Sequence, residues 1–173
     1  LAVGRLTKQK NFSYLIDEFV EYSKINSKQK LIIFGEGEER LKLQKKIDDH
    51  KLGNQIILKG KSNLIFNYMR NARAFILSSL WEEPGIVLIE SALNNLFIIS
   101  SNCKNGPREF LNNGEGGILF ESNLRGALLN KIIEFDNLNN EEKKLKIYNA
   151  KKNSKKYSLF RHYRELRLLL SLA

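Results

Sequence analysis

Short apolar runs alternate with longer amphipathic segments, and this alternation most constrains the fold of the chain. The short runs are rich in β-branched residues and are predicted strands: Leu1–Val3, Lys30–Phe34, Gln55–Lys59, Ala74–Leu77, Phe97–Ser100 and Gly117–Phe120. Segments with helical periodicity lie between them: Phe12–Asn26, Glu39–Lys51, Leu64–Arg70, Ile86–Asn94 and Pro107–Leu111. This order predicts an α/β fold, with a parallel six-stranded sheet and helices on both faces.

A helical C-terminal tail is predicted from about Leu124, where three helical stretches run to Leu172. Its last part carries an apolar stripe with steps of three or four residues: Tyr157, Phe160, Tyr163, Leu166, Leu169 and Leu170. The stripe packs either on the domain's own core or on a partner domain. A second face carries Arg161, Arg164 and Arg167, which are either solvated or available to phosphate head groups.

The composition is that of one globular domain, because 42% of the 173 residues are hydrophobic. No run of 18 apolar residues occurs, so no transmembrane helix is predicted. The start, Leu1–Arg5, has neither an initiator Met nor the pattern of a signal peptide, and we expect a piece of a longer protein. The single cysteine, Cys103, allows no intrachain disulfide and fits a cytoplasmic location.

The net charge of +10 indicates an anionic partner. Lys and Arg are scattered along the chain, without a nucleic-acid-binding motif, so we do not expect a nucleic acid. The charge fits peripheral contact with an anionic membrane surface at its inner face.

Two carboxylates eight residues apart, Glu82 and Glu90, mark the strongest candidate site. Between them, Pro84 and Gly85 indicate a loop that ends where a helix starts. A helix N-terminus offers free N–H groups and partial positive charge to an anion. The arrangement suits one anionic, hydroxyl-rich ligand held at both ends, such as a nucleotide-sugar.

A basic loop follows the first predicted strand. Gly4 permits a tight turn there, Arg5 offers a planar donor fork for phosphate oxygens, and Lys10 offers a compact charge. Lys8 is equally near in sequence, so charge alone does not select Lys10. Taken alone, these residues also fit surface charges before a helix.

Three further loops follow predicted strands. Gly35 and Gly37 lack the third glycine of a dinucleotide-binding turn and lie among glutamates, which excludes a nicotinamide site and favours close backbone packing. Gly60 could let a flat base lie against the backbone. After the fifth strand, Gly106 is followed by a Pro at a first helical position, and Glu109 could cap the backbone or bind a ligand.

Together these motifs resemble the family 4 (group 1) retaining glycosyltransferases. The resemblance rests on three segments in order: Val3–Leu6 with Lys10 and Asn11, Glu82 to Glu90 with Pro84 and Gly85 between, and Gly106–Glu109. These enzymes have the GT-B fold of two Rossmann-like domains. The resemblance covers about Leu1 to Phe120 and implies the carboxyl-terminal, donor-binding domain. The amino-terminal acceptor domain would be absent from residues 1–173.

The resemblance implies a role for each of the four charged residues. Arg5 and Lys10 match the basic pair that contacts the donor diphosphate and stabilises the departing nucleoside diphosphate. No metal or other cofactor is then required, because fixed cations neutralise the leaving group. Glu82 matches the carboxylate that holds donor-sugar hydroxyls, and Glu90 matches the carboxylate that binds ribose hydroxyls.

The start of the helix between the two carboxylates matches the family's cradle for sugar and phosphate. The matching backbone belongs to Gly85, Ile86 and Val87. Glu83 and Pro84 stand where many relatives have Gly-Phe or similar residues, so Glu83 is an alternative sugar-side carboxylate.

The implied activity is transfer of a sugar, with retention, from a nucleotide-sugar to a polysaccharide, lipopolysaccharide or lipid-linked acceptor. UDP-sugars are the favoured donors, and a chain with only the donor domain is expected to bind nucleotide without catalysing transfer. Two alternatives are half of a GT-B nucleotide-sugar epimerase and a non-catalytic nucleotide-binding module.

Overall fold

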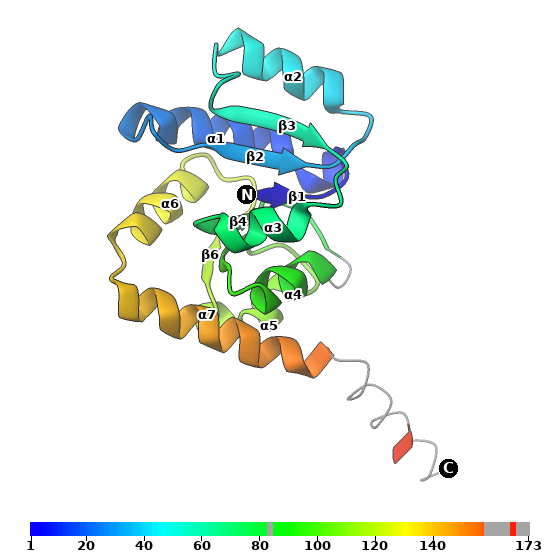
Figure 1. Ribbon diagram of the computed structural model, residues 1–173, viewed down its shortest axis with the longest axis vertical. Coiled ribbons are helices and arrows are strands. Elements are labelled where there is room, and N and C mark those ends of the chain that lie inside the picture. Colours follow the sequence, from blue (N-terminus) through cyan, green and yellow to red (C-terminus); the bar gives the residue numbers. More distant parts are fainter. Residues whose placement is uncertain (83–84, 158–166, 169–173) are drawn as a thin grey trace.

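Parallel β-strands form the centre of the domain (Figure 1), in a computed structural model that describes residues 1–82, 85–157 and 167–168. Within this part of the chain the strands are β1 (Ala2–Val3), β2 (Leu31–Phe34), β3 (Ile56–Gly60), β4 (Ala74–Leu77), β5 (Phe97–Ser101) and β6 (Ile118–Phe120). The predicted strands are confirmed with ends that shift by at most one residue.

The strands form two three-stranded ladders, β1-β2-β3 and β4-β5-β6, so the prediction of a single six-stranded sheet is wrong. At the junction, the Ile76 N–H donates to the Leu1 carbonyl at 2.8 Å, and the Leu1 amine donates to the Ala74 carbonyl at 2.9 Å. β1 has only two residues, and both pair with β2. The two bonds at the junction belong to Leu1, which precedes β1, so β1 and β4 are adjacent without forming a second ladder.

The helices of the described chain also lie where the sequence predicts them. They are α1 (Phe12–Ile25), α2 (Arg40–Asp49), α3 (Ile65–Asn71), α4 (Ile86–Leu93), α5 (Pro107–Phe110), α6 (Ala127–Asn137) and α7 (Asn140–Ser154). Short 3₁₀ turns follow β1, α5 and α7: η1 (Lys8–Lys10), η2 (Asn112–Gly114) and η3 (Lys155–Tyr157). None of the helices in this described part is long and apolar enough to cross a bilayer.

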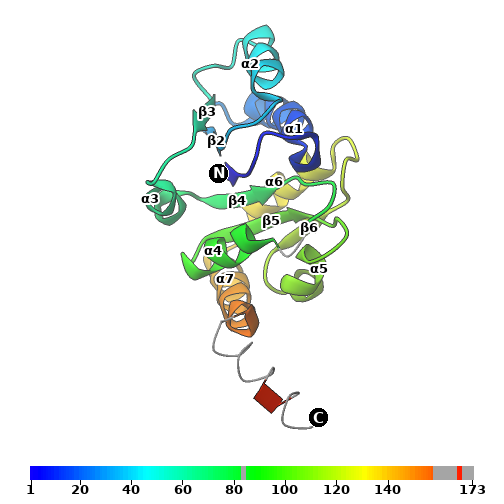
Figure 2. The same cartoon turned by 90° about the vertical axis from the view of Figure 1, so that its right-hand side faces the viewer.

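Helices cover both faces of the strands, as predicted (Figure 2). On β5, Phe97 and Ile99 join a core with α1, α2 and α6, whereas Ile98 joins a second core with α3, α4, α5 and α7. Successive strand side chains point to opposite faces, so a strand buried on both faces reads as a continuous apolar run. This explains why the strand segments lack polar alternation.

The predicted helical tail is confirmed as far as α6, α7 and η3. Asn139 and Glu142 form a capping box that starts α7. Of the predicted apolar stripe, only Tyr157 belongs to the described residues, and its ring lies 5.7 Å from that of Phe110. The other stripe positions, together with Arg161 and Arg164, lie outside the described residues.

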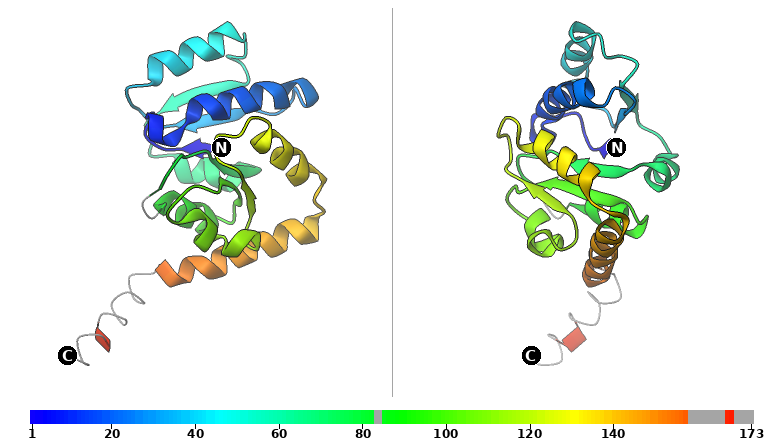
Figure 3. Two further views of the ribbon diagram at one scale, coloured as in Figure 1. Left: turned by 180° about the vertical axis from the view of Figure 1, so that it is seen from behind. Right: turned by 90° about the vertical axis from the view of Figure 1, so that its left-hand side faces the viewer.

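A buried carboxylate joins α1 to the start of α6, and these two helices lie side by side (Figure 3). Glu18 is only 4% exposed, and its two oxygens accept the Gly126 N–H at 2.8 Å and the Leu129 N–H at 2.9 Å. The first N–H groups of a helix have no intrahelical partner. Glu18 therefore satisfies two of them and adds a favourable charge at the positive end of α6.

We predict that Glu18→Ala lowers the free energy of unfolding by about 2–3 kcal/mol, since two N–H groups lose a charged acceptor. Urea unfolding measures this loss. Glu21→Ala is the control, because Glu21 lies on the same helix but is exposed. Equal stability of the two variants would contradict the capping role.

Candidate functional site

Three loops meet at the carboxyl edge of the strands, on the side to which the arrows of β1 and β2 point (Figure 1). The Leu80 N–H donates to the Gln9 carbonyl at 2.8 Å, and the Gln9 amide donates to the Trp81 carbonyl at 2.9 Å. The Glu82 N–H donates to the Lys104 carbonyl at 3.2 Å. The loops after β1, β4 and β5 are thereby tied into one surface.

Lys10 and Glu82, which are 72 positions apart in sequence, form an ion pair with an Nζ–Oε1 distance of 2.6 Å. Their side chains are 15% and 4% exposed. An ion pair with this little exposure is held in a low-dielectric surrounding, where each charge depends on the other. The structure therefore brings together two of the charged residues that the sequence selects, whereas Lys8 makes no ion pair to the described residues.

Ser79, which the sequence reasoning missed, fixes the position of Glu82. Its hydroxyl donates to Glu82 Oε1, the same oxygen that Lys10 contacts. Neither of these bonds uses Oε2, for which no hydrogen bond within the described residues is found. One oxygen of this carboxylate is thus anchored by two hydrogen bonds.

Other serines near strand ends donate hydrogen bonds to the backbone carbonyls of Ser79 and Lys10. Ser101 Oγ donates to the Ser79 carbonyl at 2.7 Å, and Ser122 Oγ donates to the same carbonyl at 3.2 Å. Ser78 Oγ donates to the Lys10 carbonyl at 2.8 Å. These serines lie at the end of β5 or within two residues after β4 and β6, and a serine at such a position carries no spacing signal in the sequence.

Gly4 makes room for Lys10. A Cβ at Gly4 would lie 3.2 Å from two side-chain carbons of Lys10, so the lysine stem runs directly over this glycine. Arg5 follows on the same loop and is exposed, without a hydrogen bond or ion pair to the described residues. Its guanidinium therefore remains available to an anion at this edge.

The start of α4 lies beside Glu82. A Cβ at Gly85 would lie 3.8 Å from the Cγ of Glu82, and α4 begins at Ile86, as predicted. The N–H groups of Ile86 and Val87 belong to the first turn and have no acceptor within the helix. Glu83 and Pro84 lie outside the described residues, so their predicted roles have no structural test.

Glu90 is the fifth residue of α4 and is partly buried. Its carboxylate has no hydrogen bond or ion pair to the described residues, and burial raises its pKa above the ordinary glutamate value. A carboxylate that loses water without gaining a protein partner is costly, and a hydroxyl-bearing ligand would lower that cost.

The remaining predicted glycines act as backbone contacts. A Cβ at Gly35 would lie 1.8 Å from the Gly4 carbonyl oxygen, and one at Gly37 would lie 2.4 Å from that of Leu6. This confirms the close packing expected of the two glycines. Gly60 ends β3 with φ +76°, and its carbonyl accepts the Gly35 N–H at 2.9 Å. Its predicted contact with a base stays a prediction.

A pocket of about 490 Å³ lies between the starts of α4 and α5, lined among others by Gly85, Gly106, Glu109 and Tyr157. Pro107 begins α5, as predicted, whereas the exposed Glu109 side chain makes no capping hydrogen bond. Of the two roles expected for Glu109, the described residues therefore do not show the capping role.

The thiol of Cys103 lies beside this edge and is 6% exposed. Burial raises its pKa, and the Glu82 carboxylate raises it further. A buried thiol with a raised pKa is a poor nucleophile. Among the described residues, no group of three His, Cys, Asp or Glu side chains could hold a metal ion.

Residues 1–153 match the family model of glycosyl transferases group 1. The chain belongs to this family. The resemblance expected from the basic loop and the two carboxylates is therefore confirmed, as is the α/β architecture of one GT-B domain.

Curated glycosyltransferases of bacteria are among its relatives. The amylovoran biosynthesis glycosyltransferase AmsD of Erwinia amylovora is 36% identical over 139 residues, covering 80% of this chain and 39% of the relative. A diphospho-undecaprenol 4-alpha-N-acetylgalactosaminyltransferase of Campylobacter jejuni is 32% identical over 141 residues, covering 80% and 38%. The glycosyltransferase chain thus spans about two fifths of the length of these relatives.

Solved structures of glycosyltransferases share the fold. Staphylococcus aureus TarM in complex with UDP superposes with a TM-score of 0.83 at 25% identity, covering 91% of this chain and 32% of that one. Anabaena HepE in complex with UDP gives 0.82 at 20% identity, covering 99% and 49%. A C-terminal domain of a group 1 glycosyl transferase from Francisella tularensis gives 0.78 at 20% identity, covering 91% and 85%.

We predict that Lys10 and Glu82 are energetically coupled in the free glycosyltransferase domain. In a double-mutant cycle of Lys10→Met and Glu82→Gln, the coupling free energy of unfolding is expected to be about 1–3 kcal/mol, because each charge is nearly enclosed. Urea unfolding of the four proteins measures it.

The exposed pair of Lys131 and Glu134, with side chains 37% and 44% exposed, serves as the control and should couple weakly. A coupling at Lys10 and Glu82 as weak as that of the control would show that solvent screens both pairs alike.

Proposed function

We propose that this chain is the donor-binding domain of a retaining glycosyltransferase and that its donor is a UDP-sugar. The observation that carries the proposal is the nearly enclosed pair of Lys10 and Glu82 beside the start of α4. It combines a cation for phosphate, a carboxylate for sugar hydroxyls and free helix N–H groups. UDP in the structures of TarM and HepE supports the choice of nucleotide.

Arg5 and Lys10 would bind the diphosphate and neutralise the charge that develops on the leaving group, without a metal. The Lys10 ammonium has three N–H donors, and Glu82 occupies one of them. The other two can reach phosphate oxygens without breaking the ion pair. All N–H donors of the Arg5 guanidinium remain for phosphate, since Arg5 is exposed and unpaired within the described chain.

The two carboxylates would bind different parts of the donor. Glu82, anchored through Oε1, would accept a sugar hydroxyl through Oε2. Glu90, one turn into α4, would accept the ribose hydroxyls. The backbone of Gly85, Ile86 and Val87 would lie against the sugar and the phosphate, and Gly60 would leave room for the base.

The acceptor side of the reaction would belong to an amino-terminal domain outside residues 1–173. The chain covers only about two fifths of the relatives named above, which is consistent with a second domain. A polysaccharide, lipopolysaccharide or lipid-linked acceptor fits the names of these relatives. One wall of a two-domain cleft positions the donor but supplies no acceptor, so the chain alone would bind nucleotide without sugar transfer.

We predict that Arg5→Ala weakens UDP binding about tenfold, because a hydrogen bond to a charged oxygen contributes roughly 1.5–3 kcal/mol. Isothermal titration calorimetry with UDP measures the affinity. Lys8→Ala is the matched control, since it removes one positive charge from the same loop and should change the affinity less than Arg5→Ala. An equal loss of UDP affinity in the two variants would show that the loop contributes only nonspecific positive charge.

We also predict that Glu90 makes UDP binding depend on pH. Its pKa is raised by burial, so the carboxylate takes up a proton at a higher pH than an ordinary glutamate. A protonated carboxyl accepts ribose hydroxyls less well, so affinity should fall as the pH is lowered through this raised pKa.

Calorimetry from neutral to mildly acidic pH tests this, with Glu90→Gln as the comparison. The variant should bind UDP more weakly at neutral pH and lack the part of the pH dependence due to Glu90. The remainder belongs to the phosphate itself. Identical pH profiles in the two proteins would assign the whole dependence to the nucleotide.

A further inference from the structure

The outward side of α7 carries lysines together with large apolar side chains. Residues three or four positions apart share a face of a helix. Such steps place four residues in one row here: Lys144, Tyr148, Lys151 and Lys155. Leu145 and Lys152 flank this row. We call these six residues the α7 outer face, in which Lys155 is the first residue of η3, directly after α7. Leu145 is 60% exposed and Tyr148 is 63% exposed, so the domain core does not cover them.

Inward lysines of the same helix have structural partners, which separates the two sides of α7. Lys146 donates to the carbonyls of Gly114 and Gly117 at 2.7 and 3.1 Å. The Lys143 ammonium lies 4.8 Å from the centre of the Phe135 ring. These lysines hold α7 on the domain, so their ammonium groups are engaged there and do not belong to the outer face.

On the outer face the charge is largely uncompensated. Lys144 pairs with Glu141 at 3.2 Å, and Lys151 donates to the neutral amide of Asn95 at 2.8 Å. Lys152 and Lys155 have neither an ion pair nor a side-chain hydrogen bond to the described residues. The positive charge therefore increases toward the C-terminal end of α7.

The other lysine-rich helix, α2, shows the opposite arrangement. Lys42 pairs with Glu39 at 2.9 Å, Arg40 with Glu36 at 3.0 Å, and Lys46 with Asp17 at 2.6 Å. Basic residues are common in this chain, but on α2 each of these three has an acidic neighbour, and among the basic residues of this helix Lys45 alone has no ion pair to the described residues. A high lysine content alone does not produce the α7 outer face.

We propose that the α7 outer face docks on an anionic lipid bilayer. Lysines without acidic partners are attracted to negative head groups, and each contributes over about one Debye length. Leu145 and Tyr148 can enter the interface between head groups and acyl chains, because both present apolar surface. Binding of a phosphate-rich polymer would not require them, so they favour a bilayer. Lys144 and Lys155 are separated by about 16 Å along the helix axis, so α7 would lie flat on the surface.

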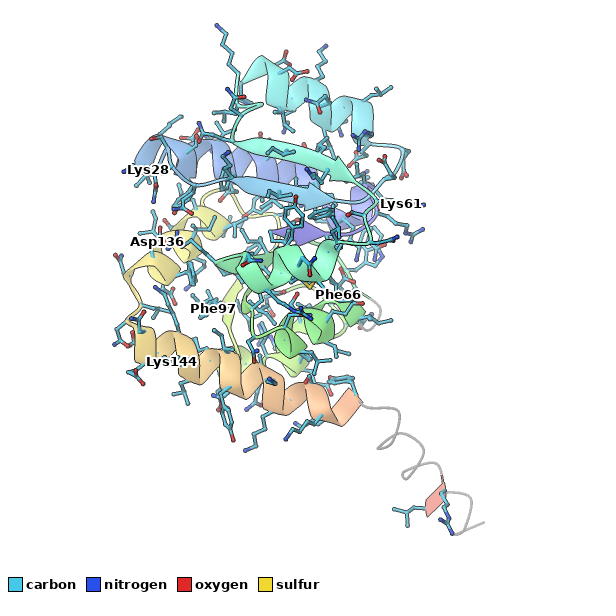
Figure 4. All side chains as sticks on the ribbon, viewed as in Figure 1. Lys28, Lys61, Phe66, Phe97, Asp136 and Lys144 are labelled. Carbon is cyan, nitrogen blue, oxygen red and sulfur yellow. The ribbon has the colours of Figure 1, made fainter. Side chains whose placement is uncertain are left out.

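This orientation places the candidate site near the membrane. Figure 4 labels Lys144 on α7, at the side of the domain opposite α2, and in Figure 1 the C-terminal end of α7 lies toward the carboxyl edge of the strands. A polar pocket of about 660 Å³, lined in part by Lys104, Arg108 and Lys156, lies between η3 and the loop after β5. Basic side chains thus lie between the end of α7 and the loop after β5, whose Lys104 carbonyl accepts the Glu82 N–H.

The test uses the 173-residue chain and two kinds of vesicle, one of phosphatidylcholine alone and one with a third of its lipid as phosphatidylglycerol. Co-sedimentation at low salt should show binding only to the anionic vesicles, and added salt should weaken it. Each lysine near an anionic surface is expected to multiply affinity roughly fivefold, so Lys152→Ala with Lys155→Ala should lower it about 25-fold. Tyr148→Ser should weaken binding that remains at higher salt.

Lys42→Ala with Lys45→Ala is the matched control, because it removes the same net charge from α2. It should reduce vesicle binding much less than the α7 pair. Equal reductions, or no binding to the anionic vesicles, would overturn the proposal, and so would full binding by Tyr148→Ser at higher salt. No nucleotide is present, so the outcome is independent of the proposed UDP site, and UDP titration of the same variants should be unchanged.

Discussion

The ion pair between Lys10 and Glu82 is the interaction on which the rest of the site depends. It joins the loop after β1 to the loop after β4, across the junction of two ladders that share few backbone hydrogen bonds. Ser79 adds a third contact to the same carboxylate oxygen. Because the pair is nearly enclosed, moving either side chain would leave an uncompensated charge, and both are thereby held in place before any ligand arrives.

The backbone around this pair is built to permit it. Gly4 has no side chain, so the stem of Lys10 can cross it, and Gly35 packs on the Gly4 carbonyl where any Cβ would clash. The serines at or just beyond the ends of β4, β5 and β6 donate hydrogen bonds to the carbonyls of Lys10 and Ser79. Small residues at strand ends thus let several loops approach closely, which a parallel sheet requires at its carboxyl edge.

Much of this could be predicted from the sequence, because the signals are local. Apolar runs locate the strands, and Gly85 before Ile86 locates the start of α4. The division of the six strands into two ladders could not be predicted in this way. It depends on how β1 pairs with its neighbours, which local sequence does not determine. The ion pair between Lys10 and Glu82 could not be predicted locally either, because the two residues are 72 positions apart. The motifs assigned them to different parts of a ligand. Ser79 was missed because a lone serine carries no spacing signal.

Charge has two distinct uses in this chain, and only the structure separates them. Lys10 and Lys46 each have an acidic partner in this chain, so their charge is compensated locally, whereas Lys146 donates to a neutral carbonyl and holds α7 on the domain. Arg5 and Lys152 have no such partner among the described residues, one at the carboxyl edge and the other on α7. A net charge of +10 therefore predicts an anionic partner only in general terms. The positions of individual cations, rather than the total, indicate where such a partner can bind.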